Sequence, residues 1–428
     1  MSRPWLGIIA DDFTGACDVA DAVSEQGASA VVTVGVPAEP PPGCDCVVVA
    51  LKSRTAPRDE AVAQSLAAAR RLTDSGCTTL YQKYCSTFDS TDDGNIGPVA
   101  DALARVPPES TLLSVGTPAT PRVGRTVYQG HLFVGGRLLS GSPMRDHPLT
   151  PMRDPDLVAV LGRQTTGPVG LIPWQVVADG PDRLDAAIDA ARADGTAHLL
   201  LDALTDADLG TAATALLRQE TRGARLLVTG AAGLAAALAR VRNTGVATPR
   251  RSVPEVPGGR RLILSGSCSE ATREQVAAFP GPRIELSPID LDADWTGTLG
   301  TVLSTLERVF DQGGGPVLVS SSATPDRLAE HRSRLGTARS SSLLETATAE
   351  IAARAVETLE VRRLLVAGGE TSGAVVQRLG LTTLHVGPAA GPGLPWMVPA
   401  SGPRLALLLK SGNFGTPGLF TDAWRCCP

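Results

Sequence analysis

The segment "GIIADDFTGACD", residues 7–18, joins an apolar run to a helical pattern. Buried strands of parallel sheets appear in sequences as continuous apolar runs, so residues 5–10 predict a strand and residues 15–26 predict the helix that follows it. Thr14 would cap this helix, and Gly15 would let a ligand approach the backbone. The segment therefore predicts the first βα unit of an α/β fold, with a ligand at the carboxyl end of the strand.

The same alternation of strand and helix patterns continues on both sides of one interruption. Strands are predicted at residues 30–36, 46–51, 112–115, 197–202 and 226–228, and again at residues 261–264, 317–320, 363–366 and 405–408. Residues 243–259 break the pattern with three prolines and predict a connector. We expect two α/β domains with mainly parallel sheets and an active site in the cleft between them. The bounds are residues 1–245 and 260–428, with a linker at 246–259.

Three further patterns complete the expected organisation. Long helices are predicted at residues 58–74 and 343–360, and a helical pattern covers residues 232–241. The Pro- and Gly-rich residues 386–403 are rigid and apolar, so we expect an ordered loop near a site.

Composition excludes several classes of function. The 428 residues are 43% hydrophobic and 19% charged, with a formal net charge of −5 and no long basic block. This balance argues against capture of nucleic acid or of an anionic membrane. The apolar run before the first two acids is too short for a secretory signal, which favours a cytoplasmic protein with small-molecule partners. The eight cysteines show no CxxC spacing, so we expect reduced thiols and no structural zinc.

Asp11 and Asp12 lie together at the first strand end. Two carboxylates would repel a phosphate there, whereas a polyol that donates hydrogen bonds, or a divalent cation, would be accepted. One acid can be explained as a helix cap that favours the helix dipole. The second acid needs another reason.

The C-terminal half contains turns of a different kind. "LILSGSCSEAT" and "LLVAGGETSGAVVQRLG" run from a strand into small residues at a helix start, which leaves backbone N–H groups free for an anionic phosphate chain. Their hydroxyls can also be structural, since Ser267 with Glu270 fits a capping box and Thr371 or Ser372 could cap a helix. "LKSGNFGTPGLF" adds Lys410 and Asn413. Acids in one half and phosphate-binding turns in the other favour phosphoryl transfer, which requires positioning, one base and Mg²⁺.

Cations that could hold a substrate carboxylate follow other apolar runs of the first half. They are Lys52, Arg54 and Lys83, in "ALKSRTAP" and "YQKYCSTFDSTDDGNIG". Each could equally be a solvated surface charge. His131, Arg145 and His147 lie in a stretch with few charges, where a histidine is more often a hydrogen-bonded structural residue.

Six motifs, in this order along nearly the whole chain, resemble those of the four-carbon acid sugar kinases, and most closely the 3-oxo-tetronate 4-kinase branch. They are "ADDFTGACD", "KYCSTFDSTDDGNIGPVADAL", "TVYQGHLFVGGRLL", "MRDHPLTPM", "AGGETSGAVVQRLG" and "LKSGNFGTPGLF". The resemblance implies an N-terminal domain that binds a sugar acid and a C-terminal domain that binds a nucleotide. ATP, with Mg²⁺, would phosphorylate O4 of a 3-oxo-tetronate such as 3-dehydro-erythronate.

The resemblance also assigns roles to residues. On the sugar side, Asp11 would orient hydroxyls, Asp12 would accept the O4 proton, and Arg54 and Lys83 would receive the carboxylate. The ATP-binding residues would be Ser267, Gly368, Gly369, Glu370, Thr371 and Gly412, with Ser265, Ser372 and Gly415 as weaker candidates. Protein ligands of Mg²⁺ are not assigned, and a homodimer is left open.

One departure from the branch affects the substrate. Residues 140–144 read "SGSPM" where the branch has an acidic, SESGM-like stretch, so the preferred tetronate could instead be threonate or erythronate. A regulatory protein that binds a sugar acid or a nucleotide without catalysis is a second alternative. A nicotinamide-dependent dehydrogenase is disfavoured, because the first βα turn lacks the glycine fingerprint with its following acidic residue.

Overall fold

The structure is a computed structural model that describes residues 3–39, 41, 43–106, 111–147, 149–244, 253–313, 315–321 and 325–428. The chain divides into two compact units, Met1–Arg250 and Arg251–Pro428. Each unit is built from strands and helices in alternation, so the predicted α/β class is confirmed. Of the predicted linker at residues 246–259, residues 246–252 lie outside the described residues.

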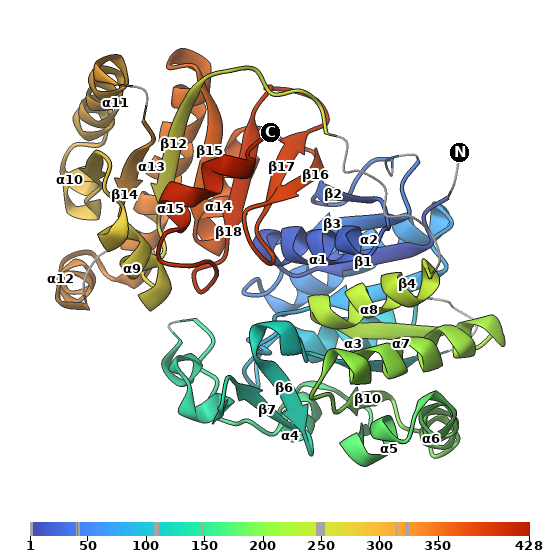
Figure 1. The fold of residues 1–428 in the computed structure, drawn as a ribbon. Helices are drawn as coiled ribbons and strands as arrows, with labels where there is room; N and C mark the ends of the chain where they lie inside the picture. The colour runs from blue at the N-terminus through green and yellow to red at the C-terminus, as the bar shows by residue number, and fades with distance from the viewer. Residues whose placement is uncertain are drawn as a thin grey trace. The chain divides into compact units, whose positions relative to one another are not determined.

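The sheet of the first unit is parallel throughout its described strands, in the order β2-β3-β1-β4-β11-β5-β10-β9. Figure 1 labels β2, β3, β1, β4 and β10 of this sheet. Every residue of β1, β3, β4 and β5 is buried, as expected for strands covered on both faces. The strands are β1 (Leu6–Ala10), β2 (Ala30–Val34), β3 (Cys46–Ala50), β4 (Thr79–Lys83), β5 (Leu113–Thr117), β9 (Val169–Ile172), β10 (His198–Leu201) and β11 (Leu226–Gly230).

Two rows of helices cover this sheet. In one row α1 packs against α8, α8 against α7 and α7 against α6, and in the other α2 packs against α3 and α3 against α4. A small antiparallel sheet, β6 (Arg125–Tyr128), β7 (His131–Val134) and β8 (Arg137–Leu138), lies apart from the main sheet. The helices are α1 (Phe13–Glu25), α2 (Arg58–Asp74), α3 (Ile96–Leu103), α4 (Leu157–Gln164), α5 (Trp174–Ala178), α6 (Pro181–Ala193), α7 (Asp206–Thr221) and α8 (Ala232–Arg242).

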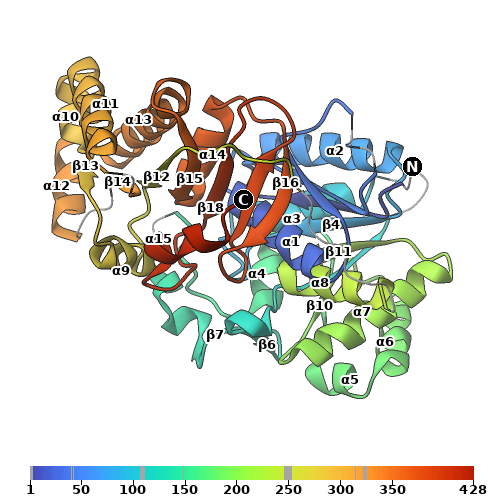
Figure 2. The same cartoon turned by 45° about the horizontal axis from the view of Figure 1, so that its top comes forward.

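The strands of the second unit follow the order β13-β14-β12-β15-β18-β17-β16 (Figure 2). The first five are parallel, whereas β17 is antiparallel to both of its neighbours. The strands are β12 (Arg260–Ser265), β13 (Arg283–Glu285), β14 (Val317–Ser320), β15 (Val361–Ala367), β16 (Thr383–Ala389), β17 (Pro395–Pro399) and β18 (Ala406–Lys410).

The longest helix of this unit, α13, packs against α10, α11, α12 and α14, while α9 packs against α15. α13 begins at Thr337, before the start predicted at residue 343. The helices are α9 (Glu270–Ala278), α10 (Pro288–Ala293), α11 (Trp295–Gln312), α12 (Pro325–Leu335), α13 (Thr337–Thr358), α14 (Gly369–Arg378) and α15 (Leu419–Asp422).

The prediction of a loop at residues 386–403 is wrong. The segment contains the end of β16 and all of β17, which form an antiparallel hairpin. Pro395 and Pro399 occupy the two ends of β17, where a missing N–H disturbs the ladder least. Trp396, Met397 and Val398 between them are buried and add this strand to the core.

Two strands of the first sheet approach each other closely at a glycine, which leads to a testable prediction. A Cβ at Gly116 of β5 would lie 1.6 Å from the carbonyl oxygen of Thr229, whereas a Cβ at Gly162 of α4 would meet no atom within 4 Å. We expect Gly116→Ala to lower the free energy of unfolding of this unit by more than about 2 kcal/mol, because backbone must move.

Gly162→Ala, the matched control, should raise that free energy by about 0.5–1 kcal/mol, because alanine loses less conformational freedom in an exposed helix. Urea unfolding followed by circular dichroism measures both changes. Equal stability of the two variants would contradict the packing at Gly116.

Candidate active site

Three neighbouring strands of the first unit end at the same level. β1 pairs with β3 on one side and β4 on the other, and Ala10 aligns with both Ala50 and Lys83. The carboxyl ends of parallel strands lie at one edge of a sheet, where ligands bind. Asp11 and Asp12, the loop after β3 with Arg54, and Lys83 at the end of β4 therefore lie together.

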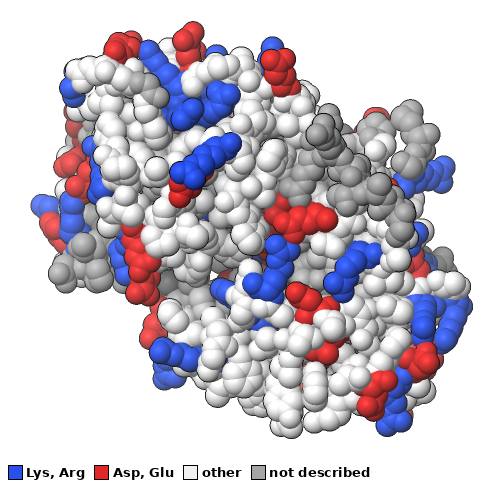
Figure 3. Space-filling model, viewed as in Figure 1, with Lys and Arg blue, Asp and Glu red and all other residues white. Residues whose placement is uncertain are grey.

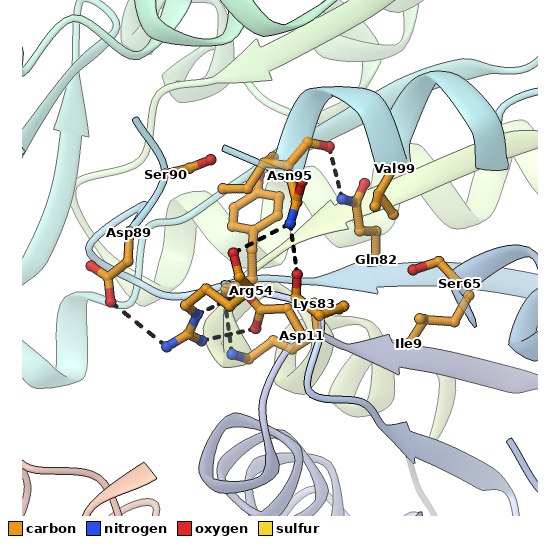
Figure 4. Close-up of a pocket in the computed structure, with 13 residues that line it drawn as sticks. Ile9, Asp11, Arg54, Ser65, Gln82, Lys83, Asp89, Ser90, Asn95 and Val99 are labelled. Atoms are coloured by element: carbon orange, nitrogen blue, oxygen red, sulfur yellow. Dashed lines mark hydrogen bonds and ion pairs between the residues drawn. The ribbon is translucent and has the colours of Figure 1, made fainter. Parts of the chain in front are cut away.

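The Arg54 guanidinium is the centre of this group (Figure 4). Its Nε and Nη2 atoms donate to the two carboxylate oxygens of Asp11 at 2.9 and 2.8 Å. Nη2 also lies 3.0 Å from Asp12 Oδ1, and Nη1 lies 3.7 Å from Asp89 Oδ2. Bidentate pairing of this kind fixes geometry as well as charge. Arg54 is thus held by three carboxylates rather than standing as a free cation.

Asp12 is the N-cap of α1, which confirms the alternative that one of the two acids caps the helix. The other predicted cap, Thr14, is a helical residue. Asp12 Oδ1 accepts a hydrogen bond from the backbone of Gly15 at 2.8 Å, and Oδ2 accepts one from the Thr14 hydroxyl at 2.8 Å. A Cβ at residue 15 would lie 2.3 Å from Asp12 Oδ1, so glycine is required for this cap. The first turn of the helix therefore fixes the carboxylate in one orientation.

The pKa values of the two adjacent acids are shifted in opposite directions. Burial raises the pKa of Asp11, and the pairing with Arg54 only partly offsets it. Burial also opposes ionisation of Asp12, but Arg54, Lys83 and the hydrogen bonds from Thr14 and Gly15 outweigh it and lower its pKa. The Asp12 carboxylate is therefore ionised at neutral pH. Its side chain remains 20% exposed and so is open to a small ligand.

The loop that carries Arg54 is locked by residues that the sequence did not single out. Asn95 Nδ2 donates to the carbonyl oxygens of Ser53 and Ala56 at 2.8 and 2.9 Å. The backbone N–H groups of Ser53 and Arg54 donate to the Asp11 carbonyl oxygen. Asn95 is buried, so it acts as a positioning residue. Asn95 is an uncharged polar residue within "DDGNIG", and nothing in the sequence indicated this role.

Other candidates of the first half have local partners. Lys83 Nζ donates to the carbonyl oxygen of Tyr84 at 2.9 Å and lies close to Gly15. His131 Nδ1 lies 2.7 Å from the Gln129 carbonyl oxygen, and His147 Nδ1 lies 2.9 Å from the Thr150 hydroxyl. These bonds within two or three residues favour the structural interpretation of both histidines.

The three glycine-rich turns of the second unit also converge. β15 lies between β12 and β18, and Ala367 aligns with Ser265 on one side and Lys410 on the other. The turns that begin after these strands hold the predicted nucleotide residues, namely Ser267, Gly368, Gly369, Glu370, Thr371 and Gly412. These turns are far apart in the sequence, and the pairing of the strands brings them together.

Glycine allows these turns to touch. A Cβ at Gly266 would lie 2.2 Å from Thr371 Oγ1, and a Cβ at Gly412 would lie 2.7 Å from Ser267 Oγ. Gly368 has a φ of 127°, which disfavours any other residue. The three turns therefore form a single surface of backbone and small side chains.

The start of α14 suits an anion. Its N-cap is Gly368, which has no side chain to satisfy the first N–H groups, so the predicted caps Thr371 and Ser372 are wrong. The Ser372 hydroxyl is buried and has no hydrogen-bond partner among the described residues. At Glu370, the backbone N–H rather than the carboxylate would suit a phosphate.

The capping box predicted for the SGSCS turn is also wrong. The N-cap of α9 is Ser269, whose hydroxyl accepts from the Thr272 N–H, rather than Ser267. Ser269 and Thr272 also donate their hydroxyls to the Gly412 carbonyl oxygen at 2.6 and 2.8 Å. Sequence reasoning missed these two residues, because the contact depends on the distant turn after β18.

The described parts of the chain contain no group of three or more His, Cys, Asp or Glu residues that could hold a metal ion. The acids at the end of β1 are already paired with Arg54. These residues do not fit a Mg²⁺ site made by the protein alone.

Family models match both halves of the chain. A model described as "Sugar-binding N-terminal domain" matches residues 6–238, and one described as "Nucleotide-binding C-terminal domain" matches residues 262–420. The acid-rich strand ends lie within the first match and the glycine-rich turns within the second.

Among curated proteins, the chain is 44% identical to a protein of Burkholderia multivorans, over 99% of this chain and 97% of the relative. It is 43% identical to a protein of Cupriavidus necator, with the same two coverages. Both relatives are named 3-oxo-tetronate kinase.

Solved structures agree over the full length. A protein of Salmonella typhimurium LT2, published under a provisional tRNA synthase label, has a TM-score of 0.85 at 39% identity and covers 99% of each chain. A protein of Haemophilus influenzae has a TM-score of 0.76 at 37% identity over 98% of this chain and 99% of the other. With both domain models matched in order and curated kinases similar from end to end, the chain belongs to the four-carbon acid sugar kinase family.

Proposed function

We propose that this protein is an ATP-dependent kinase that phosphorylates O4 of a 3-oxo-tetronate of the 3-dehydro-erythronate type, in the breakdown of four-carbon acid sugars. The observation that carries the proposal is the contact of the three turns after β12, β15 and β18, at which α14 begins without a side-chain cap. The names of the full-length relatives support the keto acid as acceptor.

In the proposed reaction the O4 oxygen attacks the γ-phosphorus while the bond from phosphorus to the leaving oxygen of ADP breaks. The electron pair of that bond leaves with ADP, and the hydroxyl proton passes to the Asp12 carboxylate. Its low pKa keeps Asp12 ionised and makes it a weak base. A weak base suffices for phosphoryl transfer, which relies mainly on positioning and charge neutralisation.

We assign the carboxylate of the substrate to Arg54 and Lys83. The Nη1 atom of Arg54 makes its longest ion pair, 3.7 Å to Asp89 Oδ2. It is therefore the guanidinium nitrogen best placed to donate to a further carboxylate. Asp11 holds the guanidinium through its other two nitrogens and would orient substrate hydroxyls.

The remaining assignments rest on the same division. Residues 1–245 would bind the sugar acid and residues 260–428 the nucleotide, joined by the linker at 246–259, and the ranges of the family models support this. Mg²⁺ would arrive with ATP and neutralise the phosphate charge. A cytoplasmic location fits the use of ATP and the eight free thiols. Among the residues that the structure describes, no helix is both long and apolar enough to cross a bilayer.

The charge of the protein disfavours a tRNA substrate. The formal net charge is −5, and on the face in Figure 3 basic side chains are interspersed with acidic ones. Binding of RNA needs a continuous basic surface.

A related tetronate is the second candidate substrate. It is favoured by one observation, the absence of an acid at residues 140–144. In this chain Ser142 serves the local backbone, since its hydroxyl donates to the Leu139 carbonyl oxygen at 2.7 Å and accepts from the Met144 N–H.

The first test is release of ADP. With ATP and Mg²⁺, the purified chain should release ADP with the 3-oxo-tetronate and much less with threonate or erythronate, and phosphorus NMR should place the ester at O4. Faster release with threonate or erythronate would select the second candidate. Calorimetric binding of these acids without any product would contradict a kinase and favour a regulatory protein.

Asp12→Asn tests the base. Asparagine still caps a helix, so the fold should persist, but it cannot accept the proton. We expect kcat to fall by about 10²–10⁴-fold while ATP affinity is retained. The control is Asp182→Asn, whose carboxylate is exposed on α6 and whose kcat should not change. Turnover like that of the wild type would remove Asp12 from this role.

Lys83→Met tests the carboxylate contact. Methionine keeps the packing of a buried chain but removes its charge. We expect KM for the keto acid to rise by about 10–100-fold, with a smaller change in kcat and none in ATP affinity. Arg70→Met, at an exposed position of α2, is the matched control. An unchanged KM would show that the acid binds elsewhere.

A further inference from the structure

Lys410, the last residue of β18, is 0% exposed. Its Nζ donates to the Thr272 hydroxyl and to the Gly412 carbonyl oxygen, each at 2.8 Å. These are two of the three hydrogen bonds that an ammonium group can donate. Within the described ranges Lys410 has no ion pair, although buried lysines are almost never left without one. The buried cation is therefore incompletely compensated by the protein.

The two contacts place this cation directly under the nucleotide turns. The Gly412 carbonyl oxygen accepts from Lys410, from Ser269 and from Thr272. Ser269 also begins α9. Gly412 in turn lies against Ser267, a predicted nucleotide contact. Lys410 thus ties the turn after β18 to the turn after β12.

The charged side chains of the surrounding elements do not supply the missing countercharge. They are Glu270, Arg273 and Glu274 on α9, Glu370 and Arg378 on α14, Asp422 on α15, and Arg362 and Arg363 on β15; β17 carries no charged residue. Burial lowers the pKa of Lys410 to about 7, and none of these groups contributes to the shift.

The two hydrogen bonds of Lys410 hold the turn, but a hydrogen-bond donor without a charge could make them as well. A buried ammonium costs several kcal/mol to desolvate, and an apolar side chain of similar length would fill the space without that cost. A side chain that can carry a positive charge at this position would be favoured by an anion bound nearby. The turns next to it are those to which the proposed function assigns the nucleotide phosphates.

We propose that Lys410 is a positioning residue of the nucleotide site, which fixes the Gly412 turn and supplies, from beneath it, the countercharge for the bound phosphates. This inference rests on the proposed function. Because Nζ is covered, it acts through the turn rather than by touching the phosphates. A buried charge interacts more strongly with a nearby anion than an exposed one does, because the surrounding dielectric is low.

The proposal links nucleotide binding to a proton. The free protein holds Lys410 with a pKa of about 7, and bound phosphates would raise that value. Between the two values, nucleotide binding takes up a proton, and affinity falls as the pH rises above about 7. A purely structural lysine would produce no such uptake.

The experiment is calorimetry of ADP binding to the full chain, without Mg²⁺, in two buffers of different ionisation enthalpy. At about pH 8, where ADP itself is ionised, the wild type should take up roughly 0.5–1 proton per ADP. Lys410→Met should take up none and bind ADP about 10–100-fold more weakly at pH 7. Lys410→Arg keeps its charge at every pH, so its affinity should not fall between pH 7 and pH 9.

A second measurement shows that the methionine variant is folded. The unfolded chain holds the lysine proton up to about pH 10 but the folded chain loses it near pH 7, so wild-type stability rises with pH in between. Without nucleotide, Lys410→Met should therefore melt at or above the wild-type temperature at pH 6.

The outcomes separate this inference from the function on which it rests. ADP binding by the wild type without proton uptake, or unchanged affinity in a folded Lys410→Met, would overturn the role of Lys410 and leave the kinase intact. A wild-type chain that binds neither ADP nor ATP would overturn both.

Discussion

Parallel pairing with aligned strand ends is the constraint on which both groups of proposed site residues depend. In the first unit β1 is held between β3 and β4 so that Ala10, Ala50 and Lys83 stand side by side. In the second, Ser265, Ala367 and Lys410 do the same. Because these strands are buried on both faces, polar side chains gather where the strands stop. The chemistry of each unit is concentrated there.

The two edges use opposite electrostatics. The first gathers acids around one guanidinium, so that burial raises the pKa of Asp11 while cations and hydrogen bonds lower that of Asp12. The second joins the uncapped start of α14 to the glycine contact of Gly266, Gly368 and Gly412, with Lys410 beneath. A neutral hydroxyl suits the first edge and a phosphate chain the second. This contrast is the physical basis of the proposed phosphoryl transfer.

Prediction from the sequence succeeded where a signal was local. Most apolar runs correspond to strands within one or two residues, and α2 has the predicted bounds, because burial on both faces leaves a continuous apolar pattern. It failed at residues 386–403, where prolines suggested a loop although they only mark the ends of β17. Helix caps were misassigned at Thr14, Ser267 and Thr371, since several hydroxyls or acids near a helix start compete and the backbone path decides among them.

The sequence by itself determined the α/β class, the family and the motifs, since periodicity and short fingerprints are properties of neighbouring residues. Only the tertiary structure decided that Arg54 is bound by three carboxylates, that Asn95 locks its loop, and that Lys410 lies under Gly412. These contacts join residues that are far apart in the chain or separated by a turn, and strand order, which no local pattern encodes, brings them together. The pKa shifts of Asp11, Asp12 and Lys410 follow from that burial and pairing.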